Sequence, residues 1–196
     1  VFLNNMIKII GNSNYKTSVI KKDKLYIVKE SLTNYDSERL KKQIEKQEYF
    51  KRNNYDVKAP RIIYKEKSRY IMEYIKSYDM IKYMNIIDIN SLKSLMNNIM
   101  KLVNTFIKES QMMVIDKSIV TSKIDSIELN LQRFHKNCII TKSLEYLRKN
   151  LHIVKDKIPV GICHGDLTLS NMLIDYNQDL YLIDFLDDFI NTPIFD

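Results

Sequence analysis

Short apolar runs bounded by turn residues fill the first 75 positions of the chain and predict β-strands. Three runs come first, and two more follow Pro60. They cover Met6–Ile10, Lys16–Ile20, Lys24–Lys29, Arg61–Tyr64 and Arg69–Ile75. Between the third and fourth runs, Leu40 and Ile44 recur at helical spacing behind a polar cap. This pattern predicts one helix from Asp36 or Ser37 to about Asn53.

The spacing of apolar residues becomes helical between Asn90 and Lys157 and predicts three helices, the first capped by Asn90 or Ser91. The three apolar stripes are Leu92, Leu95, Met96, Ile99, Leu102, Val103 and Phe106; Val120, Ile124, Ile127, Leu131 and Phe134; and Leu144, Leu147, Leu151 and Val154. Their methionine and aromatic positions are more typical of a protein core than of a ligand pocket.

Two apolar runs near the end of the chain predict a β-hairpin. Met172–Ile174 and Leu180–Ile183 are separated by the polar, turn-rich stretch Asp175–Asp179. Asn171 directly precedes the first strand, and Asp184 directly follows the second. A hairpin brings both residues to one edge, so we expect their side chains to lie close together.

The segment His164–Asn171, of sequence HGDLTLSN, adds a second carboxylate, Asp166, just before this hairpin. Phosphoryl transfer needs a carboxylate that orients the attacking hydroxyl and oxygen ligands that hold divalent ions on the phosphates. Asp166 is the candidate base. Asn171 and Asp184 are the candidate Mg²⁺ ligands, because magnesium needs only one or two protein oxygens beside phosphates and water.

Length and composition are ordinary for a globular protein, in one domain or two small lobes. The chain has 196 residues, 45% of them hydrophobic and 28% charged. No apolar run is long enough for a membrane-spanning helix, and the first residues do not form a secretory signal. Cys138 and Cys163 are too few for a disulfide framework, which favours a cytoplasmic location.

The formal net charge of +7 does not by itself indicate a nucleic-acid partner. The basic residues are mostly lysine and are scattered, without an arginine-rich block or an interleaved aromatic stripe. ATP is itself a polyanion, so a modest positive field suits a nucleotide. We therefore expect neither a nucleic-acid nor a membrane partner.

Taken together, these motifs resemble the aminoglycoside phosphotransferase and choline kinase superfamily, the small-molecule branch of the protein-kinase-like fold. HGDLTLSN resembles its H-G-D-x-x-x-x-N signature, and the segment from Ile183 to Asp196 resembles its I-D-F-G…G-D-P-x-x-D pattern. The matching positions there are Asp184, Phe185, Pro193 and Asp196, and the departures are Leu186, Asn191 and Thr192. Because Leu186 removes a flexible glycine, we do not expect a mobile, regulated activation segment.

The resemblance implies an α+β, bilobal fold. Residues 1–75 would form an N-terminal nucleotide-binding lobe that includes the hinge, with a small antiparallel sheet and one helix. Residues 76–196 would form a mainly helical C-terminal lobe with the catalytic loop. This lobe would be shorter than in relatives, which continue with helices that wall the acceptor pocket.

The resemblance also implies where a nucleotide binds. The turn Gly11, Asn12, Ser13 and Asn14 would approach the phosphates with backbone N–H groups. Lys29 would pair with the α- and β-phosphates. A helix carboxylate would hold Lys29; the spacing from Pro60 favours Glu45, and Glu48 remains an alternative.

The hinge and two supporting residues complete the implied site. Glu73, Tyr74 and Ile75 would bond the adenine edge through their backbone. His164 is expected to make structural hydrogen bonds rather than to accept a proton, and Asp196 is expected to brace the catalytic loop.

The leading functional hypothesis is ATP- or GTP-dependent phosphorylation of a hydroxyl on an amino alcohol, a sugar or an aminoglycoside. One alternative is an atypical protein kinase or ATPase, because HGDLTLSN also resembles the catalytic loop of small telomere-maintenance and tRNA-modification-complex kinases. Another is a nucleotide-binding fragment without turnover, whose acceptor site a partner subunit or a missing C-terminal segment would complete.

Overall fold

The computed structural model describes residues 6–9, 15–53, 55–78, 80–132, 138–153, 156–186 and 190–196. The chain divides into two compact units. The first comprises Val1–Glu109 and Gly161–Asp196, and the second comprises Ser110–Val160. Each unit is considered by itself.

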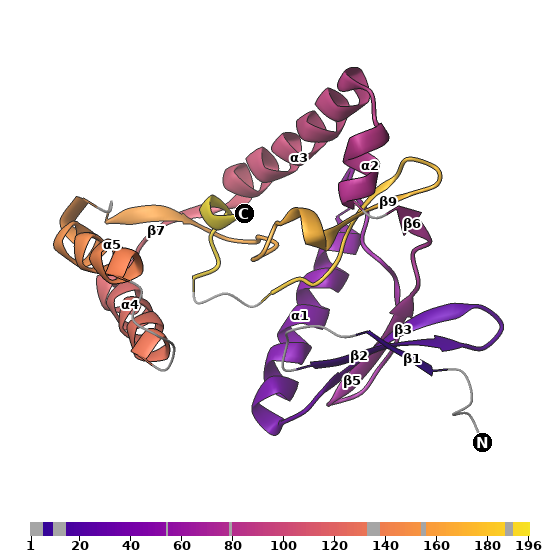
Figure 1. The fold of residues 1–196 in the computed structure, drawn as a ribbon, viewed down its shortest axis with the longest axis horizontal. Coiled ribbons are helices and arrows are strands. Elements are labelled where there is room, and N and C mark those ends of the chain that lie inside the picture. Colours follow the sequence, from indigo (N-terminus) through magenta and orange to yellow (C-terminus); the bar gives the residue numbers. More distant parts are fainter. Residues whose placement is uncertain are drawn as a thin grey trace. The chain divides into compact units, whose positions relative to one another are not determined.

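The first unit begins with a five-stranded antiparallel sheet in the order β1-β2-β3-β5-β4 (Figure 1). Its strands are β1 (Met6–Ile9), β2 (Tyr15–Lys21), β3 (Leu25–Ser31), β4 (Ile62–Lys65) and β5 (Arg69–Glu73). The five strands predicted from sequence are confirmed with small shifts of their ends. The register pairs Lys29 of β3 with Thr17 of β2 and with Tyr70 of β5, so these three side chains share one face of the sheet.

Helix α1 (Asn34–Arg52) connects β3 to β4 and runs alongside the sheet (Figure 1). Its N-cap is Thr33, whose side-chain oxygen accepts a hydrogen bond from the Asp36 amide over 3.1 Å. The predicted cap at Asp36 or Ser37 was therefore three to four residues late. Leu40 and Ile44 point inward, and they pack in one cluster with Tyr15, Tyr70 and Met72 of the sheet.

The predicted hairpin is confirmed. It consists of β9 (Met172–Asp175) and β10 (Leu180–Leu182), and β6 (Ser77–Tyr78) adds a third strand beside β9. Two helices follow β6, namely α2 (Met80–Ile86) and α3 (Ile89–Glu109). Strand β6 and helix α2 were not predicted, because elements of two and seven residues are too short to show a clear apolar period.

A single apolar core connects the hairpin, α3 and the end of α1. From α3 it takes Leu95, Ile99, Leu102 and Phe106, from the hairpin strands Met172, Ile174, Leu180 and Leu182, and from elsewhere Phe50 and Phe185, among others. Met96 was predicted to belong to the apolar stripe of α3, but its side chain is exposed. The predicted cap was late again: Asp88 precedes α3 and accepts hydrogen bonds from the amides of Asn90 and Ser91.

The second unit contains helices α4 (Lys117–Gln132) and α5 (Cys138–Lys149) and a two-stranded antiparallel ribbon of β7 (Gln111–Val114) and β8 (Lys157–Val160). The expectation of helix throughout this region was wrong for the ribbon, whose strands are remote in sequence. Of the predicted stripes, Ile124 and Leu144 are buried and Leu147 is exposed. Phe134 and Val154 lie outside the described residues.

The α+β fold class predicted from sequence is confirmed: an antiparallel sheet with one helix comes first, and mostly helices follow. The boundary at residue 75 stays a prediction, because both sides of it belong to the first unit. Across the ranges that the structure describes, no helix combines the length and apolar character needed to cross a membrane.

Phe106 and Ile107 give a direct test of how α3 faces the core. Phe106 is fully buried, whereas Ile107 is 41% exposed. We expect Phe106→Ala to lower the free energy of unfolding by about 3–5 kcal/mol, because it leaves a cavity. The matched change Ile107→Ala should cost less than about 1 kcal/mol. Urea unfolding of both variants measures this difference, and equal costs would contradict the orientation of α3.

Candidate active site

Asp166 and Asn171 are brought together by a short 3₁₀ helix, Leu169–Asn171, which ends the segment His164–Asn171 directly before β9. The Nδ2 atom of Asn171 donates to the Asp166 backbone carbonyl over 2.9 Å and to Asp166 Oδ2 over 2.8 Å. Because these acceptors require the amide nitrogen, they also set the direction of the Asn171 oxygen, Oδ1, which points away from Asp166.

Asp184 follows β10 on a backbone that hydrogen bonds hold on both sides. Before it, the Ile183 amide donates to the Asn171 carbonyl over 3.0 Å; after it, the Leu186 amide donates to the His164 carbonyl over 2.9 Å. Asp184 itself has a φ of +59°, a left-handed conformation that aspartate tolerates better than most residues. The segment that carries Asp184 is thereby attached to the segment that carries Asp166 and Asn171.

Lys29 connects the sheet to Asp184. Its Nζ atom lies 3.0 Å from Asp184 Oδ1 and donates to Gln43 Oε1 over 3.3 Å. It also lies 4.8 Å from the centre of the Tyr15 ring. Lys29 is 4% exposed. A buried ammonium needs partners of this kind, and here the lysine has a carboxylate, an amide oxygen and an aromatic face.

The assignment of Glu45 as the helix partner of Lys29 was wrong in geometry. Glu45 is exposed, and Glu48 forms a salt bridge with Lys65 at 2.8 Å. The helix residue that contacts Lys29 is the buried Gln43. A turn of about 100° per residue places Glu45 about 200° around the helix from Gln43, so both cannot face the sheet. The signal was present in the sequence, because Gln43 lies three residues after Leu40 on the apolar stripe.

His164 is the fully buried link between the two site segments. Its Nδ1 atom accepts from the Asp166 amide over 3.3 Å, and its Nε2 atom donates to the Ile183 carbonyl over 2.9 Å. This pattern requires a neutral ring, which has one donor and one acceptor nitrogen. Burial lowers the pKa of His164, against the opposing charge of Asp196. The expected structural role of His164 is confirmed.

Asp196 braces the start of the segment His164–Asn171, as expected from sequence. Its two carboxylate oxygens accept from the backbone amides of His164 and Gly165, each over 2.7 Å. Gly165 has a φ of +89°, and a side chain there would lie 2.6 Å from the Leu186 carbonyl oxygen. Glycine is therefore required where the loop passes Leu186.

Leu186 has a further partner that was not anticipated. The Nζ atom of Lys46, on α1, donates to the Leu186 carbonyl over 2.5 Å. Nothing in the sequence singled out this lysine, because it is one of many in a lysine-rich chain.

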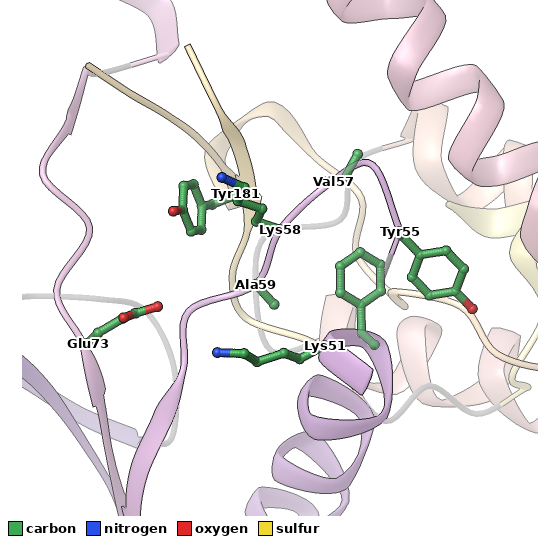
Figure 2. Close-up of a pocket in the computed structure, with 8 residues that line it drawn as sticks. Lys51, Tyr55, Val57, Lys58, Ala59, Glu73 and Tyr181 are labelled. Carbon is green, nitrogen blue, oxygen red and sulfur yellow. The ribbon is translucent and has the colours of Figure 1, made fainter. Parts of the chain in front are cut away.

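The hinge residues are placed at the end of β5. The Glu73 amide donates to the Arg61 carbonyl over 3.0 Å, and Glu73 Oε1 accepts from the Arg61 amide over 2.7 Å. Figure 2 shows the Glu73 side chain in a cavity of about 200 Å³ with Lys51, Lys58 and Tyr181. The residues that line this cavity do not include Asp166, Asn171 or Asp184. The Glu73 carboxylate therefore lines a cavity apart from these three candidate residues.

Tyr74 and Ile75 follow Glu73 beyond the end of the strand. Within the part of the chain that the structure describes, no hydrogen bond joins the backbone of either residue to another residue. Gly11, Asn12, Ser13 and Asn14, the expected phosphate turn, lie outside the described residues. Asp187 and Asp188 also lie outside them.

Comparison with known proteins identifies the fold of the chain. No protein-family model matches the chain, and no curated protein matches it. Solved structures do match. A streptomycin-ATP-APH(2")-IIa ternary complex is 16% identical, with a TM-score of 0.69 over 97% of this chain and 68% of the other. The chain has the fold of the aminoglycoside phosphotransferases.

Two further structures agree with this phosphotransferase fold. A GDP and kanamycin complex of APH(2")-IIia is 13% identical, with a TM-score of 0.68 over 98% of this chain and 70% of that one. Choline kinase LicA from Streptococcus pneumoniae is 17% identical, with a TM-score of 0.62 over 97% and 66%. The chain spans about two thirds of the length of these proteins. The resemblance predicted from sequence is confirmed at the level of the fold.

The lowered pKa of His164 predicts a specific dependence of stability on pH. Above about pH 6.5, the ordinary histidine value, the ring is neutral in both folded and unfolded states and its contribution is fully present. As the pH falls below this value, the unfolded chain takes up a proton that the folded state resists, so the free energy of unfolding decreases. We expect a loss on the order of 1 kcal/mol between about pH 7.5 and 5.5.

Urea unfolding at several pH values measures this loss in the parent protein and in His164→Gln, which lacks the titrating ring. The slope of the free energy of unfolding against pH should be smaller in His164→Gln by the part that His164 contributes. The control is the same change at the exposed His152, which shows the effect of replacing a histidine that is not buried. An identical slope in His164→Gln and the parent would contradict the role of the buried ring.

Proposed function

We propose that this chain transfers the γ-phosphoryl group of ATP or GTP to a hydroxyl group of a small molecule, such as an amino alcohol, a sugar or an aminoglycoside. One observation supports this most directly. The side chains of Asp166 and Asn171 are hydrogen-bonded at 2.8 Å, and the backbone next to Asn171 is bonded to the segment that presents Asp184 to Lys29. The similar solved structures hold ATP with streptomycin and GDP with kanamycin, and one is a choline kinase.

Asp166 is the proposed base. Its Oδ2 atom is engaged by Asn171, and Oδ1 has no partner among the residues that the structure describes. The Asn171 bond fixes the direction of the carboxylate, so Oδ1 can accept the proton of an acceptor hydroxyl placed against it. Orientation of the hydroxyl in this way is one of the protein's contributions to phosphoryl transfer.

Asn171 and Asp184 are the proposed magnesium ligands, and their free atoms fit that ion. Asn171 Oδ1 and Asp184 Oδ2 have no partner within the described ranges, whereas the other polar atom of each side chain is bonded. The described residues contain no group of three histidine, cysteine or acidic side chains that could hold a metal without a substrate. Two hard oxygens suit Mg²⁺ that also binds phosphates, whose negative charge the ion then neutralises.

Lys29 is proposed to direct its positive charge to the nucleotide phosphates. Its helix partner, Gln43, is a neutral amide that orients the ammonium without offsetting its charge. The backbone of Tyr74 and Ile75 is proposed to bond the nucleotide base, and the turn from Gly11 to Asn14 to cover the phosphates. A cytoplasmic location, where ATP and GTP are abundant, goes with this proposal.

A second candidate is a protein that binds a nucleotide without turnover. The observation that favours it is Gln43, because α1 offers Lys29 an amide where a carboxylate was expected. The two candidates differ in one measurable property, the transfer of phosphate to an acceptor. They share nucleotide binding.

The test has two stages. First, we expect ATP or GTP with Mg²⁺ to raise the unfolding temperature, because a ligand that binds only the folded state stabilises it. Second, acceptors that include choline, sugars and aminoglycosides are screened for nucleotide-dependent phosphorylation. Asp166→Ala should bind nucleotide like the parent and lose turnover by about 10²-fold or more.

The control for Asp166→Ala is Asp56→Ala, which removes an exposed carboxylate far along the chain and should keep full turnover. A parent protein that binds no nucleotide with any divalent ion would overturn the proposal. Full turnover in Asp166→Ala would overturn the assignment of the base. Binding without turnover on any acceptor would favour the second candidate.

A further inference from the structure

Lys46 is a half-buried cation on α1 that the proposed reaction does not use. Its Nζ atom donates to the Leu186 carbonyl over 2.5 Å and lies 3.7 Å from Sγ of the buried Cys163. Cys163 directly precedes His164, and Leu186 follows Asp184 by two residues. The ammonium therefore connects the helix to both segments that build the candidate site.

The backbone at Leu186 has little freedom even before Lys46 is considered. Its amide is bonded to the His164 carbonyl, and its carbonyl lies where a side chain on Gly165 would be. The preceding Phe185 is 2% exposed and packs against the rings of Phe50 and His164 at centroid distances of 5.2 and 4.5 Å. Among the residues that the structure describes, the polar partner of the Leu186 carbonyl is Lys46, on α1.

Helix α1 is thus linked to the Asp184 segment in two ways, once through Lys29 of the sheet and once directly. Gln43 orients Lys29, which meets the Asp184 carboxylate, and Lys46 meets the Leu186 carbonyl directly. Gln43 and Lys46 are three residues apart, so they lie on the same side of the helix. Both contacts use an ammonium donor, which makes strong hydrogen bonds, but only the Lys46 ammonium is on the helix itself and bonds the backbone of the Asp184 segment.

We propose that Lys46 is a positioning residue: its ammonium, bound to the Leu186 carbonyl, fixes the backbone that carries Asp184 so that this carboxylate is directed to the magnesium ion. This proposal rests on the proposed function. In the expected Lys29–Glu45 arrangement a helix carboxylate would brace the site through Lys29. In this chain the helix braces it with a cation bound to the backbone beyond Asp184.

The central variant is Lys46→Met, which keeps the length and apolar stem of the side chain and removes the ammonium. Lys46→Arg retains a charged donor and should rescue the effect. The matched control is Lys41→Met, the same change at an exposed position of the same helix. Lys46→Gln, which lacks the charge and keeps a donor, carries the same test should Lys46→Met fail to fold.

The first readout is nucleotide-dependent thermal stabilisation as a function of Mg²⁺ concentration. For Lys46→Met we expect ATP without metal to bind as in the parent and the half-saturating Mg²⁺ concentration to rise roughly tenfold, as loss of one charge-assisted hydrogen bond would cause. Lys46→Arg should return to within about twofold of the parent. An unchanged Mg²⁺ requirement in Lys46→Met, or an equal change in Lys41→Met, would overturn the proposal.

The second readout needs no ligand. Amide hydrogen exchange at Leu186 should be faster in Lys46→Met, whereas exchange at Leu182, whose amide donates to the Lys58 carbonyl, should not change. Equal exchange at Leu186 in Lys46→Met and the parent would show that Lys46 does not hold this backbone. A parent that binds no nucleotide would instead overturn the proposed function and the metal role of Asp184, whatever the exchange at Leu186 shows.

Discussion

A neutral imidazole at the centre of the first unit is the constraint on which the candidate site depends. His164 must accept at Nδ1 and donate at Nε2 at the same time, because one nitrogen faces the Asp166 amide and the other the Ile183 carbonyl. A protonated ring has two donors and cannot satisfy both. Burial keeps the ring neutral, and the ring in turn keeps the catalytic-loop segment and the Asp184 segment in register. The direct side-chain link between these two segments is therefore an uncharged group.

Three charged side chains among the described residues hold the segments around this centre. Asp196 accepts the two amides that begin the catalytic loop, Lys29 meets Asp184, and Lys46 meets the Leu186 carbonyl. Where the helix touches the buried lysine it presents the amide of Gln43. Desolvated ions are costly unless they are well bonded, so a neutral amide at that point avoids burying a further charge.

Much of the fold could be predicted because local patterns specify it. The strands of the first sheet, α1, α3 and the β9–β10 hairpin each have a clear apolar period or turn signal, and each is present. The ribbon of β7 and β8 could not be predicted in this way. Its two strands are short, apolar and separated by two helices, and pairing between remote segments leaves no periodic trace in either one. The helix caps were placed late because other cap-type residues lie inside the first turn: Asp36 in α1, and Asn90 and Ser91 in α3.

From the sequence by itself, Asp166, Asn171 and Asp184 are the predicted base and metal ligands, and these roles stay predictions. The sequence also predicted Asp196 as a brace, and the structure shows its carboxylate bonded to the His164 and Gly165 amides. Only the tertiary structure decided which helix side chains contact the candidate site. The choice of Gln43 over Glu45, and of Lys46 among many lysines, depends on the rotation of α1 about its axis. That rotation is set by the packing of Leu40, Ile44 and the sheet rather than by any motif.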